Sequence, residues 1–268
     1  MKLVVLVDNN TYIDEYYLGE PALSYYIEDN SKYILFDTGY SDLCIKNTKA
    51  LGIDLSLIST VVLSHGHNDH TGGMMHLIKQ SILNKYKVVA HPDVFKNRKC
   101  NGNCIGNPVL EKDMRENAEL ILSKKTIKIS DSIYFLGEIP VSQEFEHRDA
   151  IGYLDNNEMK KDYVMDDSAI VYHGENGLFI ITGCSHSGIC NIIEYAKEVC
   201  NERKIIGVIG GFHLFEVSER LEKTINYFQS NNIREIYPGH CVSLKAKTEM
   251  YKSIPIYEVG VGLQIDIK

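Results

Sequence analysis

Short apolar runs alternate with amphipathic segments along most of this 268-residue chain. The apolar runs predict buried strands at 3–7, 22–27, 33–36, 58–63, 87–90, 168–173, 178–182, 204–209 and 233–237. Helical periodicity predicts helices at 46–51, 74–83, 109–122, 189–200, 217–229 and 243–252. Two short strands are expected near Ile127 and Tyr134, and a last pair of strands at the C-terminus. Strands that alternate with helices in this way indicate a layered α/β fold.

One turn, between an apolar strand and a helix, is crowded with groups that bind metals. Three histidines and one aspartate fall within six positions, at His65, His67, Asp69 and His70. Neutral imidazole and carboxylate are ligands for zinc, iron or manganese. His65 and His67 are two residues apart, so in an extended segment their side chains point the same way. The spacing predicts two adjacent metal positions, one at His65/His67 and the other at Asp69/His70.

Three later strands each end in a histidine where the chain turns toward a helix. The junction sequences are Gly183-Cys184-Ser185-His186, Gly210-Gly211-Phe212-His213 and Pro238-Gly239-His240. Sites in α/β sheets form outside the carboxyl ends of the strands. The side chains expected to converge there as metal ligands are His65, His67, Asp69, His70, His186 and His240.

Composition narrows the class of protein. A net charge of −8 argues against a general nucleic-acid binder. Seven scattered cysteines fit a reducing cytoplasm better than a disulfide framework. The N-terminus is charged too early for a signal peptide, and no apolar run approaches the roughly 20 residues of a membrane span. We therefore expect a cytoplasmic protein that acts on a small-molecule substrate away from membranes, and a homo-oligomer remains open.

The motif H-x-H-x-D-H followed by T-G-G, at residues 65–73, resembles the signature of the metallo-β-lactamase superfamily. The resemblance implies a four-layer αββα sandwich formed by a single domain over 1–268, with two divalent metal ions at one edge. Zinc is the first expectation, and iron or manganese are alternatives. The resemblance also implies that Asp37 orients metal ligands, since a ligating imidazole usually donates its other N–H to a carboxylate or carbonyl. An Asp-Thr-Gly turn without this duty is the alternative.

The segment at about 93–166 is the least regular part of the chain, and we expect it to be a cap inserted over the site that sets specificity. It contains Cys100 and Cys104, which could clip a metal, although free thiols are the preferred interpretation. His91 ends the strand just before this segment and could face the site, but a structural histidine is the preferred interpretation.

The later junction motifs, with Gly137-Glu138-Ile139-Pro140, resemble those of the dihydropterin-ribofuranosylaminobenzene-phosphate synthase-like subgroup over about 35–260. Two positions depart from the wider superfamily. Cys184 stands where a bridging aspartate is usual, and the stretch at 164–167 lacks the usual histidine. We therefore expect His186 to supply the missing imidazole and Cys184 or Asp167 to supply the remaining ligand. The alternative for Cys184 is a small buried residue behind His186.

The function expected first is metal-dependent hydrolysis of a phosphoester by a metal-activated water. Asp69 would orient the nucleophile. By resemblance to phosphodiesterase-type members, His213 would touch the substrate phosphate or protonate the leaving group. The alternative for His213 is a further metal-binding or supporting histidine. Two other functions remain open: a transferase that condenses a pterin diphosphate with a ribosyl aminobenzene phosphate, and a non-hydrolytic metal sensor or redox protein.

Overall fold

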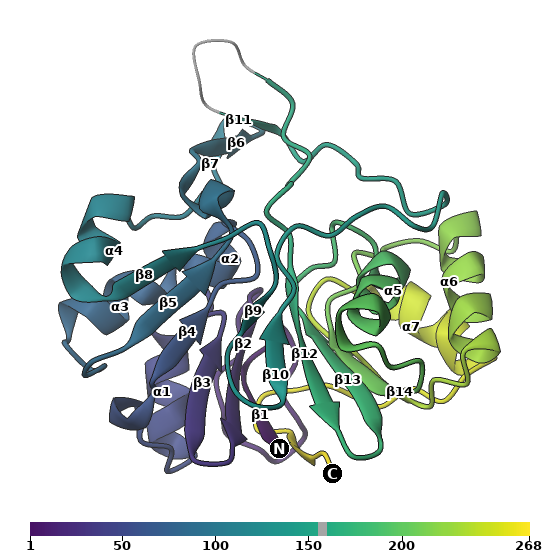
Figure 1. The fold of residues 1–268 in the computed structure, drawn as a ribbon, viewed down its shortest axis with the longest axis horizontal. Helices are drawn as coiled ribbons and strands as arrows, with labels where there is room; N and C mark the ends of the chain where they lie inside the picture. Colours follow the sequence, from purple (N-terminus) through teal and green to yellow (C-terminus); the bar gives the residue numbers. More distant parts are fainter. Residues whose placement is uncertain (155–159) are drawn as a thin grey trace.

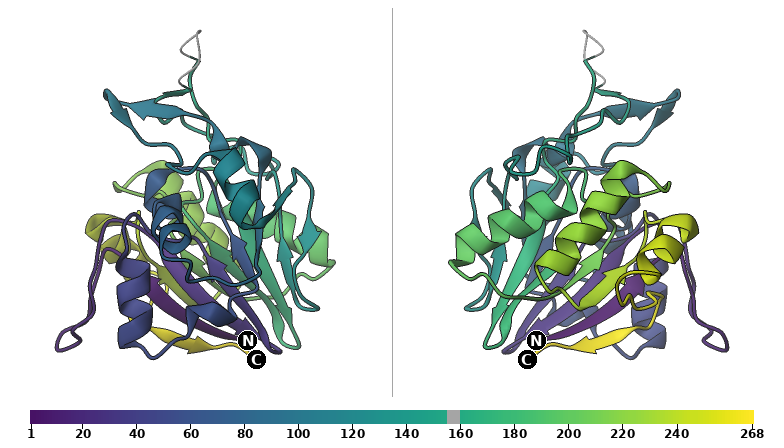
Figure 2. Two further views of the ribbon diagram at one scale, coloured as in Figure 1. Left: turned by 90° about the vertical axis from the view of Figure 1, so that its left-hand side faces the viewer. Right: turned by 90° about the vertical axis from the view of Figure 1, so that its right-hand side faces the viewer.

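The structure is a computed structural model that describes residues 1–154 and 160–268. Two β-sheets face one another at the centre of the molecule, and helices cover the outer face of each sheet (Figure 1). This arrangement is a four-layer αββα sandwich, so the predicted fold class is confirmed. The two chain ends lie side by side, where the Met1 amino group donates to the Ile267 carbonyl oxygen at 2.8 Å (Figure 2).

The first sheet has seven strands in the order β16-β1-β2-β3-β4-β5-β8. Their bounds are β1 (Lys2–Val7), β2 (Ser24–Asp29), β3 (Lys32–Phe36), β4 (Thr60–Val62), β5 (Lys87–Ala90), β8 (Glu119–Leu122) and β16 (Gln264–Asp266). Strands β3, β4, β5 and β8 are parallel, so their carboxyl ends meet at one edge. The helices of this half are α1 (Leu43–Ala50), η1 (Leu55–Leu57), α2 (Asn68–Thr71), α3 (Gly73–Lys79), η2 (Pro92–Phe95) and α4 (Glu111–Asn117).

The second sheet has six strands in the order β15-β14-β13-β12-β10-β9. Their bounds are β9 (Ile127–Lys128), β10 (Ile133–Phe135), β12 (Ala169–Gly174), β13 (Gly177–Thr182), β14 (Ile205–Gly210) and β15 (Glu235–Pro238). The outer face is covered by α5 (Ile189–Cys200), α6 (Glu219–Ser230) and α7 (Leu244–Tyr251) (Figure 1). None of the helices in the described part of the chain is long and apolar enough to cross a membrane.

The central strands are buried on both faces, and the two-residue period of a strand divides their side chains between two apolar layers. In β1, Leu3 and Val5 belong to the central layer between the sheets. Val4 and Leu6 belong to the outer layer beneath the helices of the first half. Phe179 of β13 completes the central layer from the other sheet. Because the side chains on both faces are buried, these strands have near-continuous apolar sequences.

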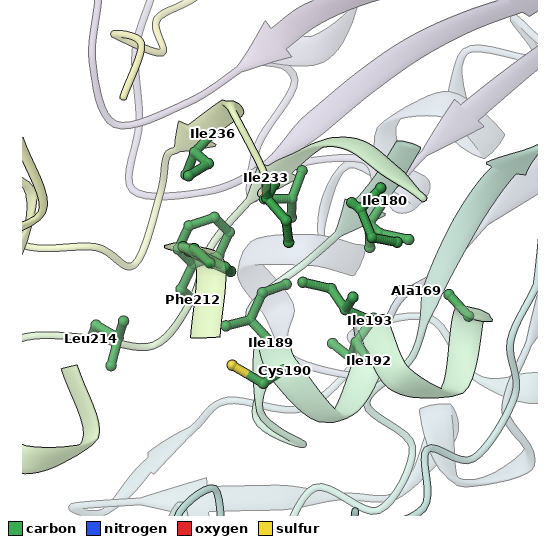
Figure 3. Packing of buried hydrophobic residues seen from close by; sticks show 14 of the residues in the cluster. Ala169, Ile180, Ile189, Cys190, Ile192, Ile193, Phe212, Leu214, Ile233 and Ile236 are labelled. Carbon is green, nitrogen blue, oxygen red and sulfur yellow. The ribbon is translucent and has the colours of Figure 1, made fainter. Parts of the chain in front are cut away.

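Helix α5 packs on the second sheet through one apolar stripe. Its residues Ile189, Ile192 and Ile193 lie on one face because an α-helix turns every 3.6 residues. In Figure 3 they lie among Ile180 of the sheet and Phe212. Each fully buried side chain of this size contributes about 1.5–3 kcal/mol relative to exposure. This packing fixes the start of α5, which directly follows the junction that carries His186.

Two expectations about elements were wrong. The predicted helix at 109–122 ends at Asn117, and Glu119–Leu122 is strand β8, parallel to β5. Leu120 and Leu122 contact the outer layer while Ile121 contacts the central layer, which is the alternation of a strand. Pairing with β5 therefore overrides the helical pattern. The expected last pair of strands is the single strand β16 within the described residues.

The segment predicted as a cap contains a small third sheet in the order β11-β6-β7. Its strands are β6 (Arg98–Cys100), β7 (Asn103–Cys104) and β11 (Tyr153–Leu154), which lie at the top of Figure 1. The same segment also supplies β8, β9 and β10 to the two main sheets. Residues 155–159 of the segment lie outside the described residues. The single domain and the cap role stay predictions.

A buried arginine ties the third sheet to the turn that carries the histidines. Arg98 is 2% exposed; its Nε lies 2.7 Å from Asp162 Oδ2 and its Nη2 lies 2.5 Å from Asp166 Oδ1. The other oxygen of Asp166 accepts the Gly66 N–H at 2.8 Å. Although burial opposes the charge on Asp166, Arg98 holds the pKa of that carboxyl below its usual value.

We expect Arg98→Leu to lower the free energy of unfolding by about 3–5 kcal/mol, because it leaves buried carboxylates without a counter-charge. Urea denaturation at neutral pH measures this loss. The matched control is Arg115→Leu, which removes an exposed ion pair with Glu111 and should change stability by less than about 1 kcal/mol. Equal losses of unfolding free energy in the two variants would contradict the role of Arg98 as a buried ion-pairing residue.

Candidate metal centre

The predicted ligands gather at the edge where carboxyl ends of strands from both sheets meet. His65 follows β4, His186 follows β13, and His240 follows β15. Gly183 permits this approach, since a Cβ at that position would lie 2.2 Å from Ser64 Oγ. A side chain at 183 would push the two sheets apart at the site.

The first donor group consists of three buried histidines. Donor atoms of His65, His67 and His186 all lie within 4.8 Å of one another. His65 Nε2 is 3.0 Å from His67 Nδ1, and the His186 ring centroid is 4.9 Å and 5.0 Å from the other two. His186 Nε2 is buried and has no hydrogen-bond partner in the described structure. A buried nitrogen without a partner is costly unless it binds a metal, so this group fits one.

The second donor group combines a carboxylate with two histidines. Asp69 Oδ2 lies 3.6 Å from His70 Nε2 and 3.3 Å from His240 Nε2, and the two nitrogens are 3.3 Å apart. Ligands held tetrahedrally at zinc-like bond lengths are separated by roughly 3.3–3.8 Å. The second group therefore has the spacing that a divalent ion requires.

Cys184 lies between the two groups. Its Sγ is 3.2 Å from His70 Nε2, and Cys184 forms a further donor group with His65 and His70. Asp167 lies outside every donor group among the described residues. Its Oδ2 instead accepts hydrogen bonds from the Ser187 N–H and hydroxyl, at 2.9 and 2.5 Å. Asp167 thus supports the turn that carries His186.

One carboxylate orients ligands in both groups. Asp37 Oδ2 lies 2.7 Å from His70 Nδ1 and also accepts the Ser64 hydroxyl at 2.7 Å. Its Oδ1 accepts the Ser64 N–H at 2.7 Å. Because the Ser64 hydroxyl donates to Asp37, it can accept the Nδ1–H of His65, which is 3.0 Å away. Both rings then turn Nε2 toward the metal positions.

Sequence reasoning missed two residues that hold His240. Asn9 Oδ1 lies 3.1 Å from His240 Nδ1, and Asp8 Oδ2 accepts the His240 N–H at 2.9 Å. These contacts turn His240 Nε2 toward the second donor group. The sequence did contain a signal, since Asp8-Asn9-Asn10 is a polar run directly after the buried strand β1.

Burial and charge give the two groups different electrostatics. Burial lowers the pKa of His67 to about 4 and lowers those of His65 and His186 well below the usual value. These imidazoles are therefore neutral near pH 7, the form that binds metals. In the second group burial alone would also lower the pKa of His70, but the carboxylates of Asp69 and Asp37 raise it. Burial opposes the charge on Asp69, but the neighbouring His70 and His240 hold the pKa of that carboxyl below its usual value, so the second group carries the negative charge of Asp69.

A cavity of about 520 Å³ opens over both groups. Its walls include His213, whose ring centroid lies 4.5 Å from that of His186. In the described part of the chain His213 belongs to no donor group. Burial lowers the pKa of His213 to about 4. His213 therefore faces the substrate space as a neutral imidazole.

The remaining candidates have ordinary roles. His91 lies 3.1 Å from Glu138 Oε2 through Nε2 and accepts the Asp93 N–H through Nδ1, as expected of a structural histidine. Cys100 and Cys104 are free thiols. Neither belongs to a donor group among the residues that the structure describes.

Comparisons with known proteins show the family to which the chain belongs. Residues 18–99 match the family model of the metallo-β-lactamase superfamily. An uncharacterized protein (MJ0448) of Methanocaldococcus jannaschii is 34% identical over 92% of both chains. From the same organism, 7,8-dihydropterin-6-methyl-4-(β-D-ribofuranosyl)-aminobenzene-5′-phosphate synthase is 32% identical over 92% of this chain and 89% of its own.

A solved structure is similar over the full length. The crystal structure of Tm1679, described as a metal-dependent hydrolase of the β-lactamase superfamily, has a TM-score of 0.85 at 28% identity and covers 100% of this chain and 99% of its own. The chain belongs to the metallo-β-lactamase superfamily, whose members bind divalent metals, and it resembles the synthase-like subgroup.

We expect Asp37→Asn to weaken metal affinity about 10–100-fold, because the amide cannot accept from both Ser64 and His70 as the carboxylate does. Competition with a chromophoric zinc chelator measures the affinity. The control is Asp29→Asn, which alters a buried aspartate that accepts from Ser130 away from the site. Indistinguishable affinities in the two variants would show that Asp37 has no part in the metal centre.

Proposed function

We propose that this protein is a hydrolase that cleaves a phosphoester bond in a phosphorylated small molecule with a metal-activated water. The fold is that of the metal-dependent hydrolases of the metallo-β-lactamase superfamily. The observation that carries the proposal is the placement of two donor groups side by side beneath one cavity, with a neutral histidine on its wall.

The donor sets assign roles to the residues. His65, His67 and His186 would hold one ion, and Asp69, His70 and His240 the other. Bound divalent ions would supply an ionised water near neutral pH and positive charge opposite the developing oxyanion. The Asp69 side chain is 29% exposed, so its carboxylate can accept a hydrogen bond from the attacking water and orient it.

His213 would act on the substrate. In the free protein the neutral ring can donate one N–H to a phosphoryl oxygen. A bound phosphate places negative charge beside the ring, which raises the pKa of His213 and favours the protonated form. A protonated His213 can then transfer its proton to the leaving oxygen.

A phosphorylated substrate is supported by the name of the 32% identical relative, which contains a 5′-phosphate. The cavity suits a small molecule rather than a polymer. Its walls include the apolar side chains of Tyr40, Ile105, Ile151 and Phe215, which would contact the part of the substrate that does not react. Cytoplasmic location and a homo-oligomer stay predictions.

Metal content tests the centre directly. Protein purified without added metal and without a histidine tag should contain close to two zinc, iron or manganese ions per chain by elemental analysis. It should cleave bis(p-nitrophenyl) phosphate, and a chelator should abolish this activity until metal is restored. Protein that binds no metal even after reconstitution would refute the proposal, and metal-loaded protein without turnover would favour a sensor.

His213→Ala should lower kcat for phosphodiester cleavage about 10²–10⁴-fold while metal content stays unchanged, because the residue contacts substrate and not metal. The control is His147→Ala, which removes a histidine whose side chain is 74% exposed. Steady-state kinetics with elemental analysis separate the two effects. Unchanged turnover in His213→Ala would sink the role assigned here.

One alternative is favoured by the similarity to the synthase over 92% of this chain. In that reaction a pterin diphosphate and a ribosyl aminobenzene phosphate condense with loss of diphosphate. The same metal centre would then stabilise the diphosphate leaving group. Release of diphosphate only when both substrates are present would identify a transferase, and cleavage of a phosphoester by itself identifies the hydrolase.

A further inference from the structure

Two thiols lie beside the second donor group. The donor atoms of Cys184, His240 and Cys241 are all within 4.8 Å of one another. Cys241 Sγ lies 3.5 Å from the Cys184 carbonyl oxygen. Both cysteines line the cavity above the metal positions. The roles derived so far do not use Cys241.

The fold brings these thiols together because a glycine follows the strand that lies between them. Cys184 follows β13 and Cys241 follows β15, while Gly211 follows β14, which runs between them. A Cβ at Gly211 would lie 2.4 Å from Cys241 Sγ and 3.4 Å from the Cys184 Cα. The Cys241 sulfur therefore occupies the space that a side chain at 211 would fill. This placement turns the sulfur inward, toward Cys184.

We propose that Cys241 is a metal-binding residue that acts with Cys184 as a pair of sulfur donors at the second position. This inference rests on the proposed metal centre. On binding, each thiol loses its proton to solvent as the sulfur–metal bond forms, and no electron is transferred. Thiolates favour zinc, iron or cobalt over magnesium, calcium or manganese. The pair would thus give the second position a preference that Asp69 and the histidines alone do not impose.

Cobalt reports the donors by absorption. Protein reconstituted with Co²⁺ should have a sulfur-to-cobalt charge-transfer band in the near ultraviolet, and the visible ligand-field bands should report bound cobalt. Cys241→Ser should lose about half of the charge-transfer intensity, because one of two thiolates remains. The matched control is Cys100→Ser, a thiol that lines the same cavity outside the donor groups and should leave the band unchanged.

The outcomes are distinct. Full charge-transfer intensity in Cys241→Ser, or none in wild-type protein that holds cobalt, would overturn the assignment of Cys241. Absence of bound cobalt altogether would instead overturn the metal centre. If the band falls by about half in Cys241→Ser but the cobalt-loaded wild-type protein cleaves no phosphoester, Cys241 would be retained as a ligand and the hydrolase refuted.

A second measurement needs no variant. Iodoacetamide labelling of wild-type protein, followed by peptide mass spectrometry, compares the alkylation rate of each cysteine with and without zinc. Zinc should protect Cys241, because a thiolate bound to zinc is not free to react, and should leave the rate at Cys100 unchanged. Cys100 is a suitable reference because both thiols are partly buried and line the same cavity. Equal rates at Cys241 with and without zinc would refute the proposal even if Cys241→Ser fails to fold.

Discussion

The metal centre depends on one buried carboxylate. Asp37 is fully buried, and its two oxygens accept from the Ser64 amide, the Ser64 hydroxyl and the His70 ring. A buried carboxylate without such partners would be strongly destabilised. These hydrogen bonds therefore stabilise the buried charge and also fix the positions of the groups that donate them. Since the same contacts orient His70 and, through Ser64, His65, one hydrogen-bond network holds these two candidate ligands.

Four residues at the site have an unusual backbone conformation. Asp37, Ser185, His213 and His240 all have positive φ, between 44° and 57°. A residue other than glycine pays of order 1–3 kcal/mol in sparsely populated conformations, and such residues persist where surrounding contacts determine them. Each of the four lies within three residues of the end of a strand. The bend after the strand turns the chain sharply and helps direct nearby polar side chains into the cavity.

Local patterns in the sequence predicted the layers of the fold and most of the residues that the structure gathers in the donor groups. The spacing of His65 and His67, and histidines at strand ends, are local features, and the structure brings these residues together. The contacts of Asn9 with His240 and of Arg98 with Asp166 join residues far apart in the chain, so no spacing rule reveals them. The same limit explains the predicted helix at 109–122, where pairing with β5 decides the outcome.

The two donor groups divide the chemistry between them. His65, His67 and His186 are neutral donors, so a dication held there keeps its full charge. Asp69 in the other group carries a negative charge, and any thiolate beside it adds another. The stronger electrophile would therefore lie on the side of His186, whose ring centroid is 4.5 Å from that of His213. A substrate oxygen that bears developing charge would gain most on that side, where the His213 ring and an ion held by His65, His67 and His186 would face the same cavity.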